Sequence, residues 1–122
     1  MRVSEKRILD AVAAVERHDA NGIYLNNAHT IVRRNSVYPN CIDVLFWGQL
    51  IASITERCIG VSSCGHHTAT TKARINLLLR KYAHTSIYQK DFVWYYSNGC
   101  EQIPFFDGVT FNRISMTQGA LP

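Results

Sequence analysis

Residues 41–62 constrain the fold more than any other part of the sequence. Three short segments, 41–47, 49–55 and 57–62, are each rich in β-branched or aromatic residues, and the breaks between them carry glycine or charge. Such segments favour strands joined by tight turns. The pattern predicts an antiparallel meander. Its apolar alternation is imperfect, which indicates that both faces of the strands are partly covered.

Two other segments have a helical period. Ser4 can cap a first helix that runs to about residue 18. After Gly65 the period changes again, and Thr68, Thr70 and Thr71 offer N-caps for a second helix over residues 71–82. The core-facing stripes are Ile8, Ala11, Val12 and Val15 in the first helix and Ile75, Leu78, Leu79 and Tyr82 in the second.

The rest of the chain is predicted to be mostly extended. Asn98-Gly99 and Asp107-Gly108 suit tight turns and predict two consecutive hairpins. The further predicted strands are 23–25, 30–34, 87–96, 102–106 and 109–113. Together these elements predict an α+β fold, in which two helices, about 4–18 and 71–82, pack on an antiparallel sheet of about five to seven strands. We expect one domain over residues 1–122 with a loose tail from about residue 115.

Positive charge is concentrated in the middle of the chain. The net charge is +4, and no acidic residue occurs between Glu56 and Asp91. The cations of that stretch are Arg57, Lys72, Arg74, Arg80, Lys81 and Lys90. A cationic block favours acidic partners, either nucleic acid or a carboxylate-rich protein surface.

The second helix carries the two strongest candidate sites. Its outer side brings together Arg74, Leu77, Arg80 and Lys81, which combine an exposed apolar anchor with positive charge and form the predicted partner-binding patch. At its start, Thr70, Thr71 and Lys72 are candidates for binding an anion, because free amide groups and hydroxyls meet a lysine there. The alternative is that the threonines only cap the helix and Lys72 is a solvated surface residue.

Two further surfaces are weaker candidates. Arg33, Arg34 and Tyr38 could grip single-stranded nucleic acid, but adjacent arginines on a strand point to opposite faces. Aromatic residues are frequent after residue 87; Phe92, Trp94 and Tyr96 are expected on one face and Val93 and Tyr95 on the other. Some of that aromatic surface could form a protein interface, for example in a homodimer.

The sequence gives little support for catalysis, metal binding or export. It contains no nucleophile elbow, phosphate-binding glycine loop or zinc-protease motif, so we expect no enzyme and no cofactor. Cys58, Cys64, His66 and His67 lack the spacing of a metal site. We see no signal peptide or membrane span, and so expect a cytoplasmic protein in which Cys41, Cys58, Cys64 and Cys100 are free thiols, with disulfides as the alternative.

Residues 44–54, Val-Leu-Phe-Trp-Gly-Gln-Leu-Ile-Ala-Ser-Ile, followed by residues 70–76, Thr-Thr-Lys-Ala-Arg-Ile-Asn, resemble a pattern of short phage and prophage accessory proteins. The resemblance covers residues 42–80, about a third of the chain. It implies a phage protein that blocks a host defence, as an anti-CRISPR protein does, or binds nucleic acid. The leading hypothesis is a non-enzymatic protein that binds and inhibits a host protein or ribonucleoprotein complex in the host cytoplasm. The alternatives are a sequence-indifferent nucleic-acid-binding module and a nucleotide-sequestering protein.

Overall fold

A computed structural model describes residues 3–25 and 29–114 of the 122-residue chain. Within them lie two helices and nine strands, which confirms the α+β class. In chain order the elements are α1 (Val3–Glu16), β1 (Gly22–Leu25), β2 (Thr30–Arg34), β3 (Ile42–Phe46), β4 (Gln49–Ile54), β5 (Cys58–Val61), α2 (Ala69–Tyr82), β6 (Ile87–Lys90), β7 (Val93–Ser97), β8 (Gln102–Pro104) and β9 (Val109–Asn112).

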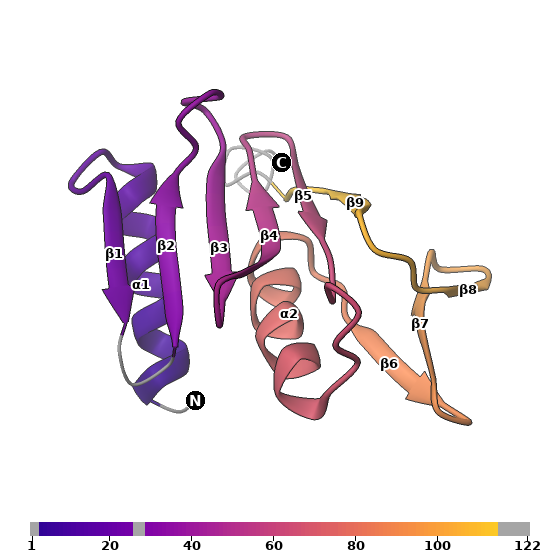
Figure 1. Ribbon diagram of the computed structural model, residues 1–122. Helices are drawn as coiled ribbons and strands as arrows, with labels where there is room; N and C mark the ends of the chain where they lie inside the picture. Colours follow the sequence, from indigo (N-terminus) through magenta and orange to yellow (C-terminus); the bar gives the residue numbers. More distant parts are fainter. Residues whose placement is uncertain (1–2, 26–28, 115–122) are drawn as a thin grey trace.

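The strands form two antiparallel sheets (Figure 1). The main sheet has six strands in the order β1-β2-β3-β4-β5-β9, and the second sheet has three in the order β6-β7-β8. The meander predicted over residues 41–62 is confirmed as β3, β4 and β5, each paired with the next. Trp47 and Gly48 join β3 to β4 with φ angles of 53° and 75°, the left-handed conformation that a tight hairpin turn requires.

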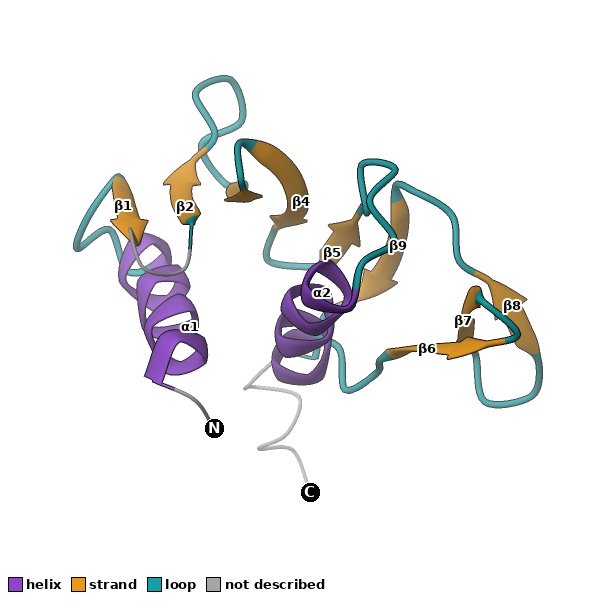
Figure 2. Cartoon of the chain, turned by 60° about the horizontal axis from the view of Figure 1, so that its bottom comes forward, coloured by secondary structure: helices purple, strands orange, loops and turns teal. Residues whose placement is uncertain are grey.

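Both helices cover the same face of the main sheet (Figure 2). α1 packs on β1, β2 and β3, and α2 packs on β4, β5 and β6. The predicted inward stripes are confirmed: Val12 and Val15 of α1 and Ile75 and Leu78 of α2 are fully buried. They meet the inner side of the sheet in one core, because the strands alternate and every second side chain points to the helices.

α2 begins earlier than predicted because Thr68 is its cap. The Thr68 backbone is extended, and its hydroxyl oxygen accepts a hydrogen bond from the Thr71 amide at 3.2 Å. α1 begins at Val3, so Ser4 lies inside the helix and does not occupy the N-cap position that was predicted for it. The predicted loose tail, residues 115–122, lies outside the described residues.

The C-terminal strands differ from the prediction in two places. Residues 87–96 are two strands, because Asp91 and Phe92 form a turn with φ angles of 51° and 65° that no glycine announces. The hairpin expected at Asp107-Gly108 is wrong, because β9 leaves β8 and pairs with β5 in the main sheet. The carboxylate of Asp107 accepts hydrogen bonds from the amide and the hydroxyl of Ser63, both at 2.8 Å, and these hold the chain at the crossing.

Candidate partner-binding groove

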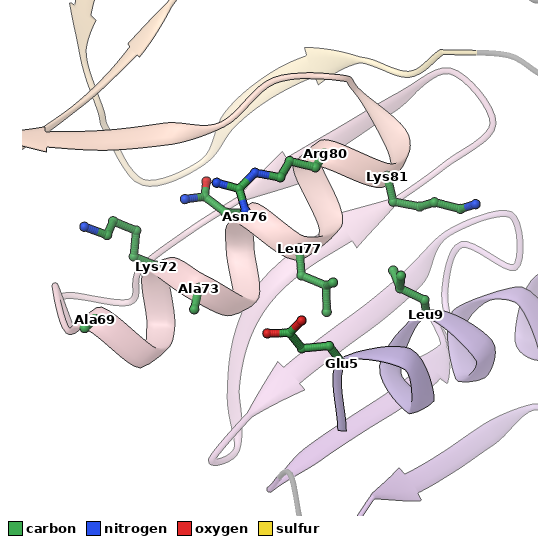
Figure 3. A pocket seen from close by; sticks show the side chains of 9 residues that line it. All are labelled: Glu5, Leu9, Ala69, Lys72, Ala73, Asn76, Leu77, Arg80 and Lys81. Carbon is green, nitrogen blue, oxygen red and sulfur yellow. The ribbon is translucent and has the colours of Figure 1, made fainter. Parts of the chain in front are cut away.

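A groove lies between the two helices on the outer side of the helical layer (Figure 3). Its volume is about 520 Å³. It is lined by Glu5 and Leu9 from α1 and by Ala69, Lys72, Ala73, Asn76, Leu77, Arg80 and Lys81 from α2. The groove therefore joins two helices that lie far apart in the sequence.

The floor of the groove is apolar. Leu77 points from α2 toward Glu5 and Leu9 of α1 (Figure 3). The sequence predicted an exposed Leu77, and this is wrong: Leu77 is only 9% exposed. Leu77 faces α1, and Glu5 and Leu9 of that helix line the groove with it (Figure 3), a proximity of distant segments that the pattern of α2 alone does not contain.

The cationic side chains stand around this floor. Lys72 and Arg80 project from the side of α2 that faces away from α1, with Asn76 between them (Figure 3). Arg80 and Lys81 are exposed. The ammonium of Lys72 donates a hydrogen bond to the Gln89 side chain of β6 at 3.3 Å. Within the described residues none of these three cations has an ion-pair partner, and Glu5 is the one acidic residue of the lining.

Asn76 fixes α2 against the second sheet. It is 6% exposed, and its side-chain amide donates to the Ile87 carbonyl at 2.9 Å and accepts from the Ile87 amide at 2.6 Å. A buried pair of this kind holds the helix at one rotation, because any turn of the helix would leave both backbone groups unsatisfied. The rotation of α2, and hence the positions of its cations, is therefore set by Asn76.

The structure separates residues that the sequence analysis had grouped into one partner-binding patch. Three residues of the partner-binding patch, Leu77, Arg80 and Lys81, line the groove, but Arg74 does not. Arg74 is half-buried, and its guanidinium carbon lies 5.6 Å from the centroid of the Phe46 ring. The side of α2 that carries Arg74 is turned toward the sheet, so this cation is engaged inside the fold.

The three residues proposed to bind an anion do not share a cavity. Thr70 and Thr71 line a second cavity of about 430 Å³, together with Trp47 and His66, whereas Lys72 lines the groove. Thr71 is buried, and its hydroxyl oxygen accepts from the Thr68 hydroxyl at 3.0 Å. Its polar groups are thus used in capping α2, as the alternative interpretation of these threonines states.

The comparison with protein families decides the origin of the chain. The family model described as "Kyanoviridae Gp96 protein" matches residues 1–112, which is most of the chain. The chain belongs to this family. No curated protein and no solved structure matches it. The resemblance to phage proteins is thereby confirmed, since Kyanoviridae are phages, but the Gp96 family name carries no activity.

In this Gp96 family member, each of the two weaker candidate surfaces has a residue that is engaged inside the fold. Arg33 is exposed, whereas Arg34 points to the helices and donates to the carbonyls of Val15 and Pro39, so the two arginines do face opposite ways. Of the aromatic residues, Trp94 is buried and Phe92, placed in the turn, is 92% exposed. Phe92 therefore does not share a strand face with Trp94.

The cysteine and histidine residues form no metal-binding group within the described part of the chain. All four cysteines are free. Burial raises the pKa of the Cys41 thiol, and the neighbouring carboxylate of Asp43 raises it further. His67 stacks on Trp94 with 4.3 Å between the ring centroids. No helix among the described residues is long and apolar enough to cross a bilayer.

Behind the groove, the inner side of α2 contains one strongly shifted group. Burial raises the pKa of Tyr82 to about 12, and the negative charge of Glu16 adds to the shift while Arg113 opposes it. Arg113 donates to Glu16 at 3.0 Å, and its guanidinium carbon lies 4.9 Å from the centroid of the Tyr82 ring. Tyr82 thus belongs to the packing that joins α2, α1 and the end of β9.

The sequence analysis missed the α1 side of the groove. Glu5 and Leu9 were not proposed as site residues, although Leu9 lies outside the inward stripe of α1. Leu77 likewise lies outside the inward stripe of α2. A large apolar residue beside the main stripe of each of two helices is the signal that could have placed the helices side by side.

Proposed function

We propose that this phage protein is a non-enzymatic accessory protein that binds and inhibits a host macromolecule, a component of host defence, in the manner of an anti-CRISPR protein. In this proposal it acts in the cytoplasm of the host cell. The contact surface is the groove between α1 and α2, and the partner presents an acidic protein surface to it.

The observation that carries the proposal is the uncompensated charge around an apolar floor. Lys72, Arg80 and Lys81 have no acidic partner among the described residues, and Glu5 is the single carboxylate in the lining. A folded protein gains little from grouping like charges, since they repel one another. Interfaces, by contrast, combine an apolar centre with a polar, charge-complementary rim, and this is the composition of the groove.

The residue types that line the groove also favour a protein partner over nucleic acid. Surfaces that bind single strands place aromatic rings along a cationic path so that bases can stack on them. The lining of the groove contains no aromatic residue. Its leucine and alanine side chains offer instead a surface on which another apolar side chain can be buried.

Affinity capture from a lysate of the phage's host tests the proposal. The wild-type chain is compared with the double variant Arg80→Glu/Lys81→Glu and with a control of equal charge change, Arg57→Glu/Lys90→Glu, whose residues are exposed and outside the groove. The groove variant reverses charge at the end of α2 and costs about 1 kcal/mol of stability, so folding is checked by circular dichroism.

We expect nuclease-resistant capture of a host protein that is lost in the groove variant and kept in the control. In cells, expression of the wild-type chain should restore plating of a phage that the host defence restricts, and the groove variant should not restore it. Capture that disappears after nuclease treatment, or that both variants retain, would overturn the proposal.

A further inference from the structure

The groove is shaped by how two helices share one sheet. α1 covers β1, β2 and part of β3, and α2 covers β4 and β5 (Figure 2). The groove, lined by residues of both helices, runs between them on the surface of the layer. Six strands about 4.8 Å apart span roughly 29 Å, which is more than the roughly 20 Å that two helices of about 10 Å each cover. The two helices therefore leave a furrow between them, along which an elongated segment can lie.

We infer that the segment that binds this furrow is an amphipathic α-helix of the partner, with acidic residues along one flank. This inference rests on the proposed function and names the element of the partner that the groove accepts. Its support is charge complementarity together with the order of small, apolar and cationic residues on α2.

The apolar contact comes from one row of α2. Ala69, Ala73 and Leu77 follow one another at helical spacing, and both alanines are exposed. Leu9 of α1 faces this row across the groove. Small residues let a second helix approach closely, and the leucines at the far end supply the surface against which its apolar ridge packs.

The charged contact comes from the neighbouring row. Lys72 and Arg80 are eight residues apart on α2, a rise of about 12 Å along the axis. Carboxylates at positions i and i+7 or i+8 of a helix have nearly the same separation, since seven to eight residues rise about 10–12 Å. A partner helix that lies along α2 can therefore pair with both cations at once, whereas Lys81 continues the row of Ala69, Ala73 and Leu77, four residues after Leu77.

Glu5 sets which flank of the partner faces which helix. It stands on the α1 side of the groove, away from Lys72 and Arg80 (Figure 3). An acidic flank turned toward α1 would meet a like charge, so the acidic flank must face α2 and the flank near α1 must be neutral or basic. The groove thus selects one rotation of the partner helix.

A designed peptide tests this directly. The probe is a peptide of about 20 residues with an apolar ridge at helical spacing and Glu at i and i+8 on one flank, labelled for fluorescence anisotropy. Its control has the same composition in an order that mixes apolar and acidic residues around the helix. Polyglutamate and a single-stranded oligonucleotide serve as purely charged competitors.

We expect the amphipathic peptide to bind and the permuted peptide to bind at least about tenfold more weakly. Ala73→Gln, which places a larger neutral side chain on the floor, and Arg80→Glu should each weaken binding about tenfold, whereas the exposed Lys90→Glu should leave it unchanged. Glu5→Gln should strengthen binding. Equal binding of the permuted peptide, polyglutamate or the oligonucleotide would show that the surface recognises charge alone and would overturn the inference.

Applying Ala73→Gln to the host-lysate capture separates this inference from the proposed function. A partner that Arg80→Glu/Lys81→Glu loses and Ala73→Gln keeps would leave the proposed function standing and contradict the helix in the groove. A partner that both variants keep would contradict both.

Discussion

The inner and outer sides of α2 differ in what holds each residue in place. On the inner side Ile75, Leu78 and Leu79 are 0% exposed and pack on the main sheet. On the outer side Ala73 and Arg80 are exposed and contact no other element through a hydrogen bond or ion pair within the described residues. The inner side is fixed by the needs of folding. On the outer side Arg80 and Lys81 make no ion pair within the described residues, so folding does not explain why these two positions carry positive charge, and a partner can.

The largest expected effect concerns the inner side. Leu78→Ala removes a fully buried side chain and leaves a cavity, so it should lower the free energy of unfolding by about 3–4 kcal/mol. Urea denaturation measures it. Lys81→Ala on the outer side is the control and should change stability by less than about 1 kcal/mol. Similar losses in both variants would remove the distinction between the two sides.

Asn76 lies between the inner and outer sides of α2, and its replacement should lower stability nearly as much as the replacement of Leu78. Asn76→Ala leaves the buried amide and carbonyl of Ile87 without their partner, at a cost of about 2–3 kcal/mol. Hydrogen exchange should become faster at the start of β6. If Asn76→Ala weakens partner binding as well, the rotation of α2 is confirmed as what places the cations; unchanged exchange at Ile87 would contradict the role of this side chain.

Tyr82 makes the inner side sensitive to alkaline pH. Its pKa is raised to about 12, mainly by burial, so the folded state favours the neutral phenol more than the unfolded chain does. This contribution is complete below about pH 10 and is lost as the pH rises toward about 12, a change of roughly 2 kcal/mol. The difference in unfolding free energy between wild type and Tyr82→Phe, followed from pH 9 to about 12, should shrink by that amount. A constant difference would show that Tyr82 ionises as easily when folded.

Thr68 is expected to matter less, because it only begins the helix. Thr68→Ala removes the hydroxyl oxygen that accepts from the Thr71 amide and should cost about 1 kcal/mol. Thr70 is exposed and lies two residues after Thr68, so Thr70→Ala is the matched control and should not lower stability. Thermal unfolding of the two variants separates capping from a general need for threonine at the start of α2.

The same contrast explains which parts of the molecule the sequence predicts. The inward stripes of both helices and the β2 segment were predicted because each is defined by neighbours a few residues apart, where periodicity determines structure. The turn at Asp91-Phe92 escaped prediction because no glycine follows Asp91, and an aromatic residue such as Phe92 rarely adopts a left-handed conformation. Local signals thus describe the inner, folding side well.

The groove escaped prediction because it depends on contacts between distant segments. Leu77 faces α1 (Figure 3) only because both helices lie on one face of the sheet, and no local period encodes that choice. The pairing of β9 with β5 across the intervening α2 is of the same kind. The residue types of the patch were recognised from the sequence, but their division between groove and core, with Arg74 turned inward over Phe46, required the fold.

Replacing Lys72 should have the smallest effect on stability, and it tests most directly whether the outer side of α2 serves a partner and not the fold. Lys72 lies in the first turn of α2, where a cation opposes the helix dipole, and no acidic residue occupies that turn. Lys72→Glu should therefore raise the free energy of unfolding, by about 0.5 kcal/mol after the loss of its hydrogen bond to Gln89. It should at the same time weaken binding of the acidic amphipathic peptide. A residue whose replacement stabilises the fold and impairs binding is held in the sequence by the partner. If Lys72→Glu instead destabilises α2 and leaves peptide binding unchanged, the lysine serves the fold and the outer side of the helix loses its special status.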